Sequence, residues 1–416
     1  MKFRFLLAAC LCACAVLTLS AQKLEITPPQ ALCDEVVVIR ASGLPPNEPV
    51  TLQAALVDGA KKRWSSQAEF IADPQGVVDA SRQAPVKGSY KEVSAMGLIW
   101  AMKPEDKNVF RYLWSGDLGT QVVDFQLLVG GRQVATAQFE QRTIAAGVHS
   151  INVKGELHGM LLVPDTPGPH PGVLVLGGSE GGLPLPKAAW LASHGFAAFA
   201  LAYFNYEDLP KHLEAIPLEY FGSALGWLRK RPEVIPDKIA VMGTSRGAEL
   251  ALQLGSMYPH IRAVVAYVPA NYRYPACCGG NQVQFAWTWQ GHPMAFFFPH
   301  GNLFNQTAPM QAAIPVEQTH GPVMLISGDD DRVWPSSIMA NGIVERLKDT
   351  HFQYPVKHLD YAHAGHFAGR PEIVPEWKGT MEWGGSPKGD AESSLDAIPK
   401  VLEFLRTSLE SAAPAK

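Results

Sequence analysis

From residue 23 to 145 the chain consists of short runs of apolar and β-branched residues with turn signals between them. We expect strands at four of these runs: Glu35–Ala41, Val50–Leu56, Gln121–Leu128 and Gln133–Gln141. Asp58-Gly59 and Gly130-Gly131 are typical turn pairs. Short strands separated by turns predict an all-β, immunoglobulin-like sandwich domain over residues 23–145. Its polar residues are spread like solvent-facing strand positions, so we expect no chemistry there.

After residue 150 the apolar runs become nearly continuous, which is typical of strands covered on both faces. Five such runs are Pro171–Leu176, Ala197–Leu201, Lys238–Met242, Ala263–Val268 and Val323–Ser327. Stretches of expected helix alternate with them: Pro186–Ser193, Leu218–Arg229, Arg246–Gly255, Ser336–Leu347 and Ser393–Leu409. This alternation predicts a parallel, doubly wound sheet, and we assign residues 150–412 to an α/β domain. Residues 271–315 are long, aromatic and irregular, so we expect a lid or pocket wall there.

The first residues have a different pattern. Lys2 and Arg4 precede an uncharged apolar run, Phe5–Leu19, and small residues lie before Gln22. This layout predicts a secretory signal peptide over residues 1–21, with an uncleaved anchor or a lipid anchor at one of its cysteines as the alternatives. We therefore expect an exported protein, periplasmic or secreted. No other segment is apolar enough to predict a membrane span.

The composition is that of an ordinary globular protein, with 416 residues of which 47% are hydrophobic and 18% charged. A net charge of −4 does not favour nucleic acid as a partner. Cys33, Cys277 and Cys278 lie beyond the expected signal, and their odd number argues against a disulfide framework. Adjacent cysteines bridge only through a strained ring, so we expect Cys277 and Cys278 to be free thiols. No cysteine or histidine cluster has zinc-type spacing.

Gly243-Thr244-Ser245-Arg246-Gly247 matches the G-x-S-x-G pattern of a nucleophile elbow. The strand-like run Lys238–Met242 leads into it and the helix-like run Glu249–Leu254 leaves it, which is the strand–turn–helix context that such an elbow requires. The sharp turn brings neighbours too close for side chains, and the two glycines remove that clash. We expect Ser245 to be a nucleophile; an ordinary loop with Ser245 as a helix N-cap is the alternative.

The acid and the base follow in the order that this fold uses, serine, acid, histidine. Asp331 lies just after a late apolar strand and best matches the acid, with Asp330 as the alternative. His366 follows a glycine in a loop and is the expected general base. His363 and His366 have the spacing of a metal-binding pair, but no third ligand lies at a useful spacing, so we do not expect a metal site. We expect a triad of Ser245, Asp331 and His366, without a metal or cofactor.

An acyl hydrolase also needs N–H donors for the oxyanion that forms on attack. We expect one donor to be the backbone N–H of Arg246, the residue after the nucleophile. The others are expected in the glycine-rich loop Gly177–Gly182, at the backbone of Ser179 and Glu180. This loop lacks the Lys-Ser/Thr ending of a phosphate-binding loop, so we do not expect it to bind a nucleotide.

Several stretches resemble the family of acyl-CoA thioesterases and bile-acid-CoA:amino-acid N-acyltransferases. In the C-terminal part they are Ala200–Pro210, Leu218–Phe221, Gly243–Glu249, Asp330–Trp334, Gly365-His366 and Trp383–Gly385. In the N-terminal part they are Asp34-Glu35, Gly43–Pro45 and Met96–Ala101. The resemblance covers residues 23–412 and implies a β-sandwich followed by an α/β-hydrolase domain that acts on acyl thioesters. The family's triad positions fall on Ser245, Asp331 and His366.

The resemblance implies hydrolysis of a small-molecule acyl thioester, or of another ester, through an acyl-Ser245 intermediate. The amidating branch of the family has cysteine at this position, so we expect hydrolysis rather than transfer to an amino acid. Arg273 is the one candidate cation for an acidic acceptor, and we expect it on the solvated surface. The chain departs from the family at Glu180, where glycine is usual, in residues 271–315, and in its export signal, since acyl-CoA is an intracellular metabolite. An exported carboxylesterase and a non-catalytic binding protein are the alternatives.

Overall fold

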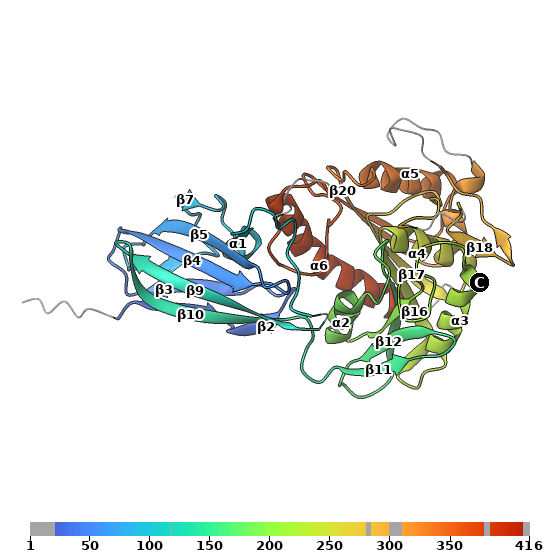
Figure 1. Cartoon of the computed structure of the whole chain (residues 1–416), viewed down its shortest axis with the longest axis horizontal. Coiled ribbons are helices and arrows are strands. Elements are labelled where there is room, and N and C mark those ends of the chain that lie inside the picture. The colour runs from blue at the N-terminus through green and yellow to red at the C-terminus, as the bar shows by residue number, and fades with distance from the viewer. Residues whose placement is uncertain (1–20, 117, 280–283, 299–309, 378–382, 411–416) are drawn as a thin grey trace, which may run out of the picture.

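The computed structural model describes residues 21–116, 118–279, 284–298, 310–377 and 383–410. An all-β part comes first along the chain and an α/β part follows it (Figure 1). The expected leader, residues 1–21, lies outside the described residues except for its last position. Within the described ranges, no helix combines the length and the apolar composition that a bilayer crossing requires.

The all-β part packs two sheets face to face. One sheet has the order β1-β3-β6 and the other the order β2-β10-β9-β4-β5-β7, with β8 also paired to β5. Every second residue of β4 and β5 is buried between them, as a two-layer sandwich requires. The elements are β1 Lys23–Thr27, β2 Gln30–Leu32, β3 Val38–Ser42, β4 Pro49–Val57, β5 Arg63–Ile71, β6 Val78–Asp79, β7 Lys87–Gly88, α1 Gly97–Trp100, β8 Lys103–Pro104, β9 Thr120–Val129 and β10 Arg132–Arg142.

An eight-stranded sheet forms the centre of the second part, in the order β11-β12-β14-β13-β16-β17-β20-β21. The α/β fold class is confirmed, with one refinement. β12 is antiparallel to both of its neighbours, β11 and β14, and the expected parallel sheet consists of the six strands β14-β13-β16-β17-β20-β21. The strands are β11 His149–Val153, β12 His158–Val163, β13 His170–Leu176, β14 Ala197–Ala202, β16 Val234–Thr244, β17 Ile261–Tyr267, β20 Val323–Gly328 and β21 Val356–Tyr361.

Helices cover both faces of this sheet, which explains why its strands are almost entirely apolar. On the side facing the sandwich, α2 and α6 share a hydrophobic cluster with Val173 and Val175, and on the opposite face α3, α4 and α5 share one with Leu174 and Leu176 (Figure 1). The helices are α2 Leu185–Ser193, α3 Leu218–Arg229, α4 Arg246–Met257, α5 Ser336–Asp349 and α6 Pro387–Glu410.

Residues 271–315 leave the sheet between β17 and β20. Their described residues include β18 (Trp287–Trp289), β19 (His292–Pro293) and the 3-10 turn Met310–Ala312, and a second 3-10 turn, Val316–Gln318, follows. β15 (Ile216–Pro217), β18 and β19 form a small separate sheet. Figure 1 shows β18 beyond α4, at the end of the molecule away from the sandwich. The expected lid therefore has local structure of its own.

Candidate active site

Ser245 lies in the turn between β16 and α4 with a left-handed backbone, φ 57° and ψ −119°. Its N–H donates to the carbonyl of Tyr267 on β17 at 2.9 Å, which ties the turn to the sheet. A Cβ on Gly243 would lie 1.9 Å from the carbonyl oxygen of Gly247, and one on Gly247 would lie 2.3 Å from that of Gly177. The two glycines therefore permit a turn that no larger residue fits, as the motif predicts.

The structure brings together the three side chains that the sequence predicts. Ser245 Oγ lies 3.0 Å from His366 Nε2. His366 Nδ1 lies 3.0 and 2.9 Å from the two carboxylate oxygens of Asp331. Since an ionised carboxylate only accepts, Nδ1 carries a proton, and Nε2 of the neutral ring accepts the hydroxyl proton of Ser245. This arrangement can activate a hydroxyl for attack on a carbonyl carbon.

Asp331, and not its neighbour Asp330, faces the imidazole. The Asp331 side chain is fully buried and also accepts the backbone N–H of Val333 at 3.0 Å. Asp330 accepts the N–H of Gly385 at 3.0 Å and pairs with the Arg332 guanidinium. Asp330 thus holds a loop together, and it does not contact the imidazole as the alternative acid would.

Two tryptophans beside the imidazole were not among the expected site residues. The rings of Trp334 and Trp383 lie 5.8 and 6.1 Å from that of His366, the first edge-on and the second stacked. The N–H of His366 also donates to the carbonyl of Trp383 at 2.9 Å. Both residues lie in stretches that resemble the family, but their packing on His366 depends on chain segments that meet only in the fold.

The expected oxyanion donors lie on two neighbouring turns. Arg246 is the first residue of α4, where the helix itself offers its N–H no acceptor. Ser179 and Glu180 follow β13, and neither backbone N–H donates to another described residue. Asn205 Nδ2 holds this loop by donating to the carbonyl of Glu180 at 2.8 Å. The three N–H groups are therefore free to bind a substrate oxygen.

Lys187 on α2 contacts the residue before the nucleophile and the neighbouring strand β17. Its ammonium nitrogen donates to Thr244 Oγ1, next to the nucleophile, and lies 3.7 Å from the centroid of the Tyr267 ring. The pKa of Lys187 is lowered to about 7, chiefly because burial penalises the ammonium, while Glu372 and Glu180 act in the opposite direction. No feature of the sequence singles out this lysine.

Arg246 connects the elbow to residues 273–278, which we call the strap. Its guanidinium donates to the carbonyl oxygens of Pro275 and Tyr274 at 2.8 and 3.1 Å and pairs with Glu249 at 3.1 Å. Glu249 is fully buried and accepts Trp287 Nε1 of β18 at 2.6 Å. Burial raises the pKa of Glu249, with Arg246 opposing that effect. The strap and β18 are thus bound to the first turn of α4.

Arg273 is not on the solvated surface, so that expectation is wrong. Only 6% of the residue is exposed. Its guanidinium donates to Gln253 Oε1 at 2.7 Å, to the carbonyl of Ala295 at 2.9 Å and to that of Gln311. These acceptors satisfy the charge inside the protein, and Arg273 serves to hold the inserted segment rather than an acidic acceptor.

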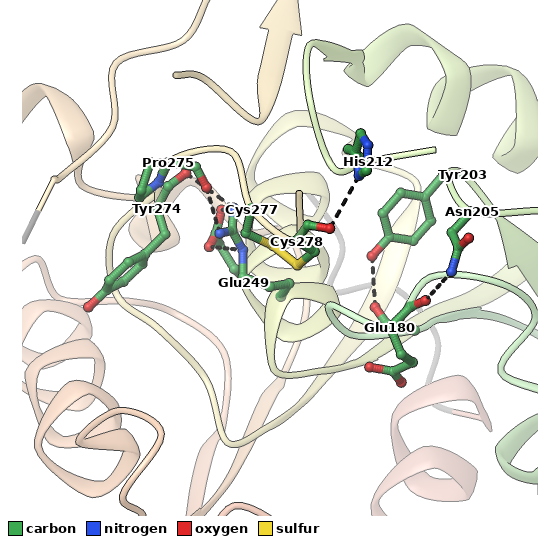
Figure 2. Close-up of a disulfide and its surroundings, with 11 residues drawn as sticks. Glu180, Tyr203, Asn205, His212, Glu249, Tyr274, Pro275, Cys277 and Cys278 are labelled. Carbon is green, nitrogen blue, oxygen red and sulfur yellow. Dashed lines mark hydrogen bonds and ion pairs between the residues drawn. A yellow bond between two sulfur atoms is a disulfide. The ribbon is translucent and has the colours of Figure 1, made fainter. Parts of the chain in front are cut away.

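Cys277 and Cys278 form a disulfide, which contradicts the expectation of free thiols (Figure 2). The backbone of Cys278 adopts a left-handed φ of 77°, a conformation that the residue type does not predict. Cys277 pairs with Leu213 in an isolated β-bridge, and His212 Nδ1 donates to the carbonyl of Cys278 at 3.2 Å. The bridge closes the C-terminal end of the strap. Cys33 is free and buried.

Among the described residues, one group places metal-ligand atoms together: His158, Glu207 and Asp208. His158 already uses both ring nitrogens, Nδ1 with Glu207 at 3.0 Å and Nε2 with Asp208 at 3.2 Å. Lys154 also pairs with Glu207 at 3.2 Å. These side chains pair with one another, and the group shares no residue with the triad.

Family models match both parts of the chain. Residues 34–155 match the acyl-CoA thioester hydrolase/BAAT N-terminal region, and residues 216–411 match the BAAT/acyl-CoA thioester hydrolase C-terminal region. The two matches together cover most of the chain and include all three residues of the triad.

Relatives match along nearly the full length. Acyl-coenzyme A thioesterase 1 of Rattus norvegicus is 34% identical over 93% of this chain and 96% of its own. The Homo sapiens protein of that name is 32% identical over 95% of this chain and 100% of its own. Acyl-coenzyme A thioesterase 2, mitochondrial, of Homo sapiens is 32% identical over 95% of this chain and 87% of its own. Among solved structures, the α/β hydrolase MGS-M1 from a deep-sea metagenome library has a TM-score of 0.42 and 20% identity over 64% of this chain and 98% of its own, too little to bear on the substrate.

The relatives contradict the expected export. They are acyl-coenzyme A thioesterases, and one of them is named for the mitochondrion, a compartment inside the cell. The assignments of a secreted, periplasmic or lipid-anchored protein are therefore wrong. A basic start followed by an apolar run is a pattern of hydrophobicity alone, and it does not specify a compartment.

Proposed function

The chain belongs to the acyl-CoA thioester hydrolase/BAAT family, and from that premise we propose that it hydrolyses acyl thioesters of coenzyme A through an acyl-serine intermediate. The observation that carries the proposal is the hydrogen-bonded series from Ser245 Oγ through His366 to Asp331. Side chains in this order and at these distances perform acyl transfer in unrelated hydrolases.

In the proposed mechanism, Ser245 Oγ attacks the thioester carbonyl while His366 Nε2 takes its proton. Asp331 keeps the proton of the neutral ring on Nδ1 and stabilises the imidazolium that forms. The backbone N–H groups of Arg246, Ser179 and Glu180 bind the oxygen that becomes negative. The thiol leaves with the proton from His366, and the same histidine then activates a water molecule that releases the acid and restores Ser245.

The test compares Ser245→Ala with Ser150→Ala, a change at an exposed serine on β11. With a panel of acyl-CoA substrates of different chain length, Ser245→Ala should lower turnover by a factor on the order of 10⁴ or more, as loss of a triad nucleophile does. Ser150→Ala should remain within about twofold of the wild type, because no catalytic group changes. Turnover by Ser245→Ala at the wild-type rate would exclude this nucleophile.

Two further measurements on the same variants separate hydrolysis from the alternatives. A fluorophosphonate probe should label the wild type and Ser150→Ala but not Ser245→Ala, whereas a non-catalytic binding protein would not be labelled at all. With excess glycine or taurine present, the product should remain the free acid, since the acyl-enzyme is an oxygen ester. An amide as the main product would identify a transferase.

A further inference from the structure

The Cys277–Cys278 disulfide borders a cavity beside the proposed oxyanion loop. The cavity has a volume of about 480 Å³, and its lining includes Ser179, Glu180, Asn205, Lys211, His212 and Cys278. Figure 2 shows the disulfide between His212 on one side and the carbonyls of Tyr274 and Pro275 on the other. The cavity therefore lies between the loop where the oxyanion would be bound and Cys278 of the disulfide.

The two sulfurs differ in access. Cys278 is exposed and lines the cavity. Cys277 is half-buried, packs against the apolar core under α3 and α4, and pairs through its backbone with Leu213. A nucleophile that enters the cavity thus reaches Cys278 before Cys277. If it attacks Sγ of Cys278, the sulfur of Cys277 is the leaving group.

A thioester hydrolase produces a nucleophile of this kind at every turnover. Under the proposed function, the bond that breaks joins the acyl carbon to the sulfur of the leaving group, and the acyl oxygen is held by Ser179 and Glu180. The released thiol therefore starts next to the cavity that Cys278 lines. Thiolates attack disulfide sulfurs directly, at rates that depend on access to the attacked sulfur.

We propose that the Cys277–Cys278 disulfide exchanges with the released thiol, a pantetheine-type thiol such as coenzyme A, which forms a mixed disulfide on Cys278. The thiolate attacks Sγ of Cys278, the bond to Sγ of Cys277 breaks, and Cys277 departs as a thiolate that takes up a proton. One disulfide is consumed and one is formed, so no outside oxidant is needed. Attack by Cys277 on the mixed disulfide releases the thiol and restores the bridge.

His212 is the group placed to accept the proton of the incoming thiol. Its Nδ1 donates to the carbonyl of Cys278, so the neutral ring has its lone pair on Nε2. Within the described part of the chain, Nε2 has no hydrogen-bond partner. A Cβ on Gly279 would lie 2.6 Å from His212 Cε1, which shows how closely the ring lies against the residue that follows Cys278.

The proposal rests on the proposed function for the identity of the thiol, but its test does not need hydrolysis. The full chain with its bridge intact, as wild type and as Ser245→Ala, is incubated with coenzyme A without oxygen, quenched with acid and analysed by intact mass and peptide mapping. We expect one coenzyme A adduct, on Cys278, in both proteins. At equal thiolate concentration it should form about tenfold faster than the adduct with glutathione, because binding in the cavity raises the local thiol concentration.

Variants assign the reacting sulfur. With coenzyme A disulfide as the probe, Cys277→Ser should form the adduct on Cys278 readily, and the matched Cys278→Ser should form it on Cys277 about tenfold more slowly, because that sulfur is less accessible. His212→Gln, which keeps a donor for the carbonyl of Cys278 but offers no base, should slow exchange by the wild-type bridge with coenzyme A. Cys33→Ser should exchange like the wild type.

An intact bridge after incubation would overturn the proposal, as would an adduct on Cys277 or equal rates with glutathione. If hydrolysis depends on Ser245 while the bridge stays intact, the proposed function stands and the exchange fails. If Ser245→Ala exchanges while no thioester is hydrolysed by the wild type, the cavity binds the thiol and the proposed function fails.

Discussion

His366 is fixed by contacts on several sides. Asp331 holds Nδ1, the rings of Trp334 and Trp383 flank the imidazole, and the backbone N–H of His366 is bound to the carbonyl of Trp383. Only 6% of His366 is exposed. An imidazole held in this way needs little reorganisation when it takes a proton, which is how a protein lowers the barrier to proton transfer.

The roles of the neighbouring acids can be separated by single substitutions. Asp331→Asn removes the charge that stabilises the imidazolium and favours the wrong tautomer, so turnover should fall by a factor on the order of 10⁴. Asp330→Asn keeps an oxygen for the N–H of Gly385 and should lower turnover less than about tenfold, since it acts only through the loop. The check is steady-state kinetics on one acyl-CoA. A larger loss at Asp330 would reverse the assignment.

Lys187 should make stability depend on pH in the alkaline range. Its pKa is about 7 in the fold against an ordinary 10.5 when unfolded. Between these values the unfolded chain binds more protons than the native one, so the free energy of unfolding should rise with pH across this window. Below the window Lys187 is protonated in both states, and the full cost of burying its ammonium lowers the free energy of unfolding. Lys187→Met should show a smaller increase in the free energy of unfolding with pH over this window.

Urea denaturation of Lys187→Met at pH 7, 8.5 and 10 provides the check, with Lys107→Met, a change at an exposed lysine, as the control. The control should keep the wild-type slope. If Lys187→Met keeps that slope too, the amine is not penalised by burial.

The sequence predicts the triad better than its surroundings, and the reason is locality. Ser245 lies in a pattern of five residues, and Asp331 and His366 each follow a strand in a fixed order. Arg273 is bound by acceptors at positions 253, 295 and 311, so its burial depends on segments that meet only after folding. Lys187 on α2 likewise contacts Thr244 at the end of β16, a residue distant in the sequence.

Among the elements, helices with a clear apolar stripe agree best with expectation. α3 has the expected bounds, Leu218–Arg229, whereas α6 begins at Pro387 rather than Ser393. β5 (Arg63–Ile71) was not expected. Its inward positions include Ser66 and Ala68, which weaken the hydrophobic alternation, and Ser66 Oγ satisfies its burial by donating to the carbonyl of Leu98 at 2.5 Å.

The attachment of the strap to α4 depends on a buried ion pair. Arg246→Met leaves the carboxylate of Glu249 buried without its partner and should lower the free energy of unfolding by about 3–5 kcal/mol. Adding Glu249→Gln removes the uncompensated charge and still accepts from Trp287, so the double variant should regain most of the loss. Chemical denaturation of the two single variants and the double variant measures the coupling. A double variant no more stable than Arg246→Met would argue that Glu249 is neutral in the fold.

At the scale of the whole molecule, one hydrophobic core runs from the sandwich through α2 and α6 into the eight-stranded sheet. Polar contacts reinforce the junction: Asp34 Oδ2 accepts Trp190 Nε1 at 3.0 Å and His194 Nε2 at 2.7 Å. The N–H of Ile373 donates to the carbonyl of Cys33 at 2.7 Å. Two parts joined in this way are expected to unfold together.

Asp34→Ala leaves the buried indole N–H of Trp190 without an acceptor and should lower the free energy of unfolding by about 1–3 kcal/mol. Asp34→Asn keeps an acceptor oxygen and should lower the free energy of unfolding by less than Asp34→Ala does. Differential scanning calorimetry should show one transition in the wild type, moved to lower temperature as a whole in Asp34→Ala. Two separate peaks in the wild type would mean that the parts fold independently.

The insertion between β17 and β20 has a consequence for how this molecule can diversify. These two strands hydrogen-bond to each other directly, whatever the length of chain that leaves the sheet between them. Ser245, Asp331 and His366 lie outside the inserted segment, and the segment is attached to α4 through Arg246, Glu249 and Gln253. Away from these attachments the segment can change its sequence or length while the reacting groups stay in register. Homologues can then differ in the turns of this segment while they keep the buried contacts that hold it to α4, and an engineered replacement of the segment has to preserve the acceptors of Arg246 and the indole of Trp287.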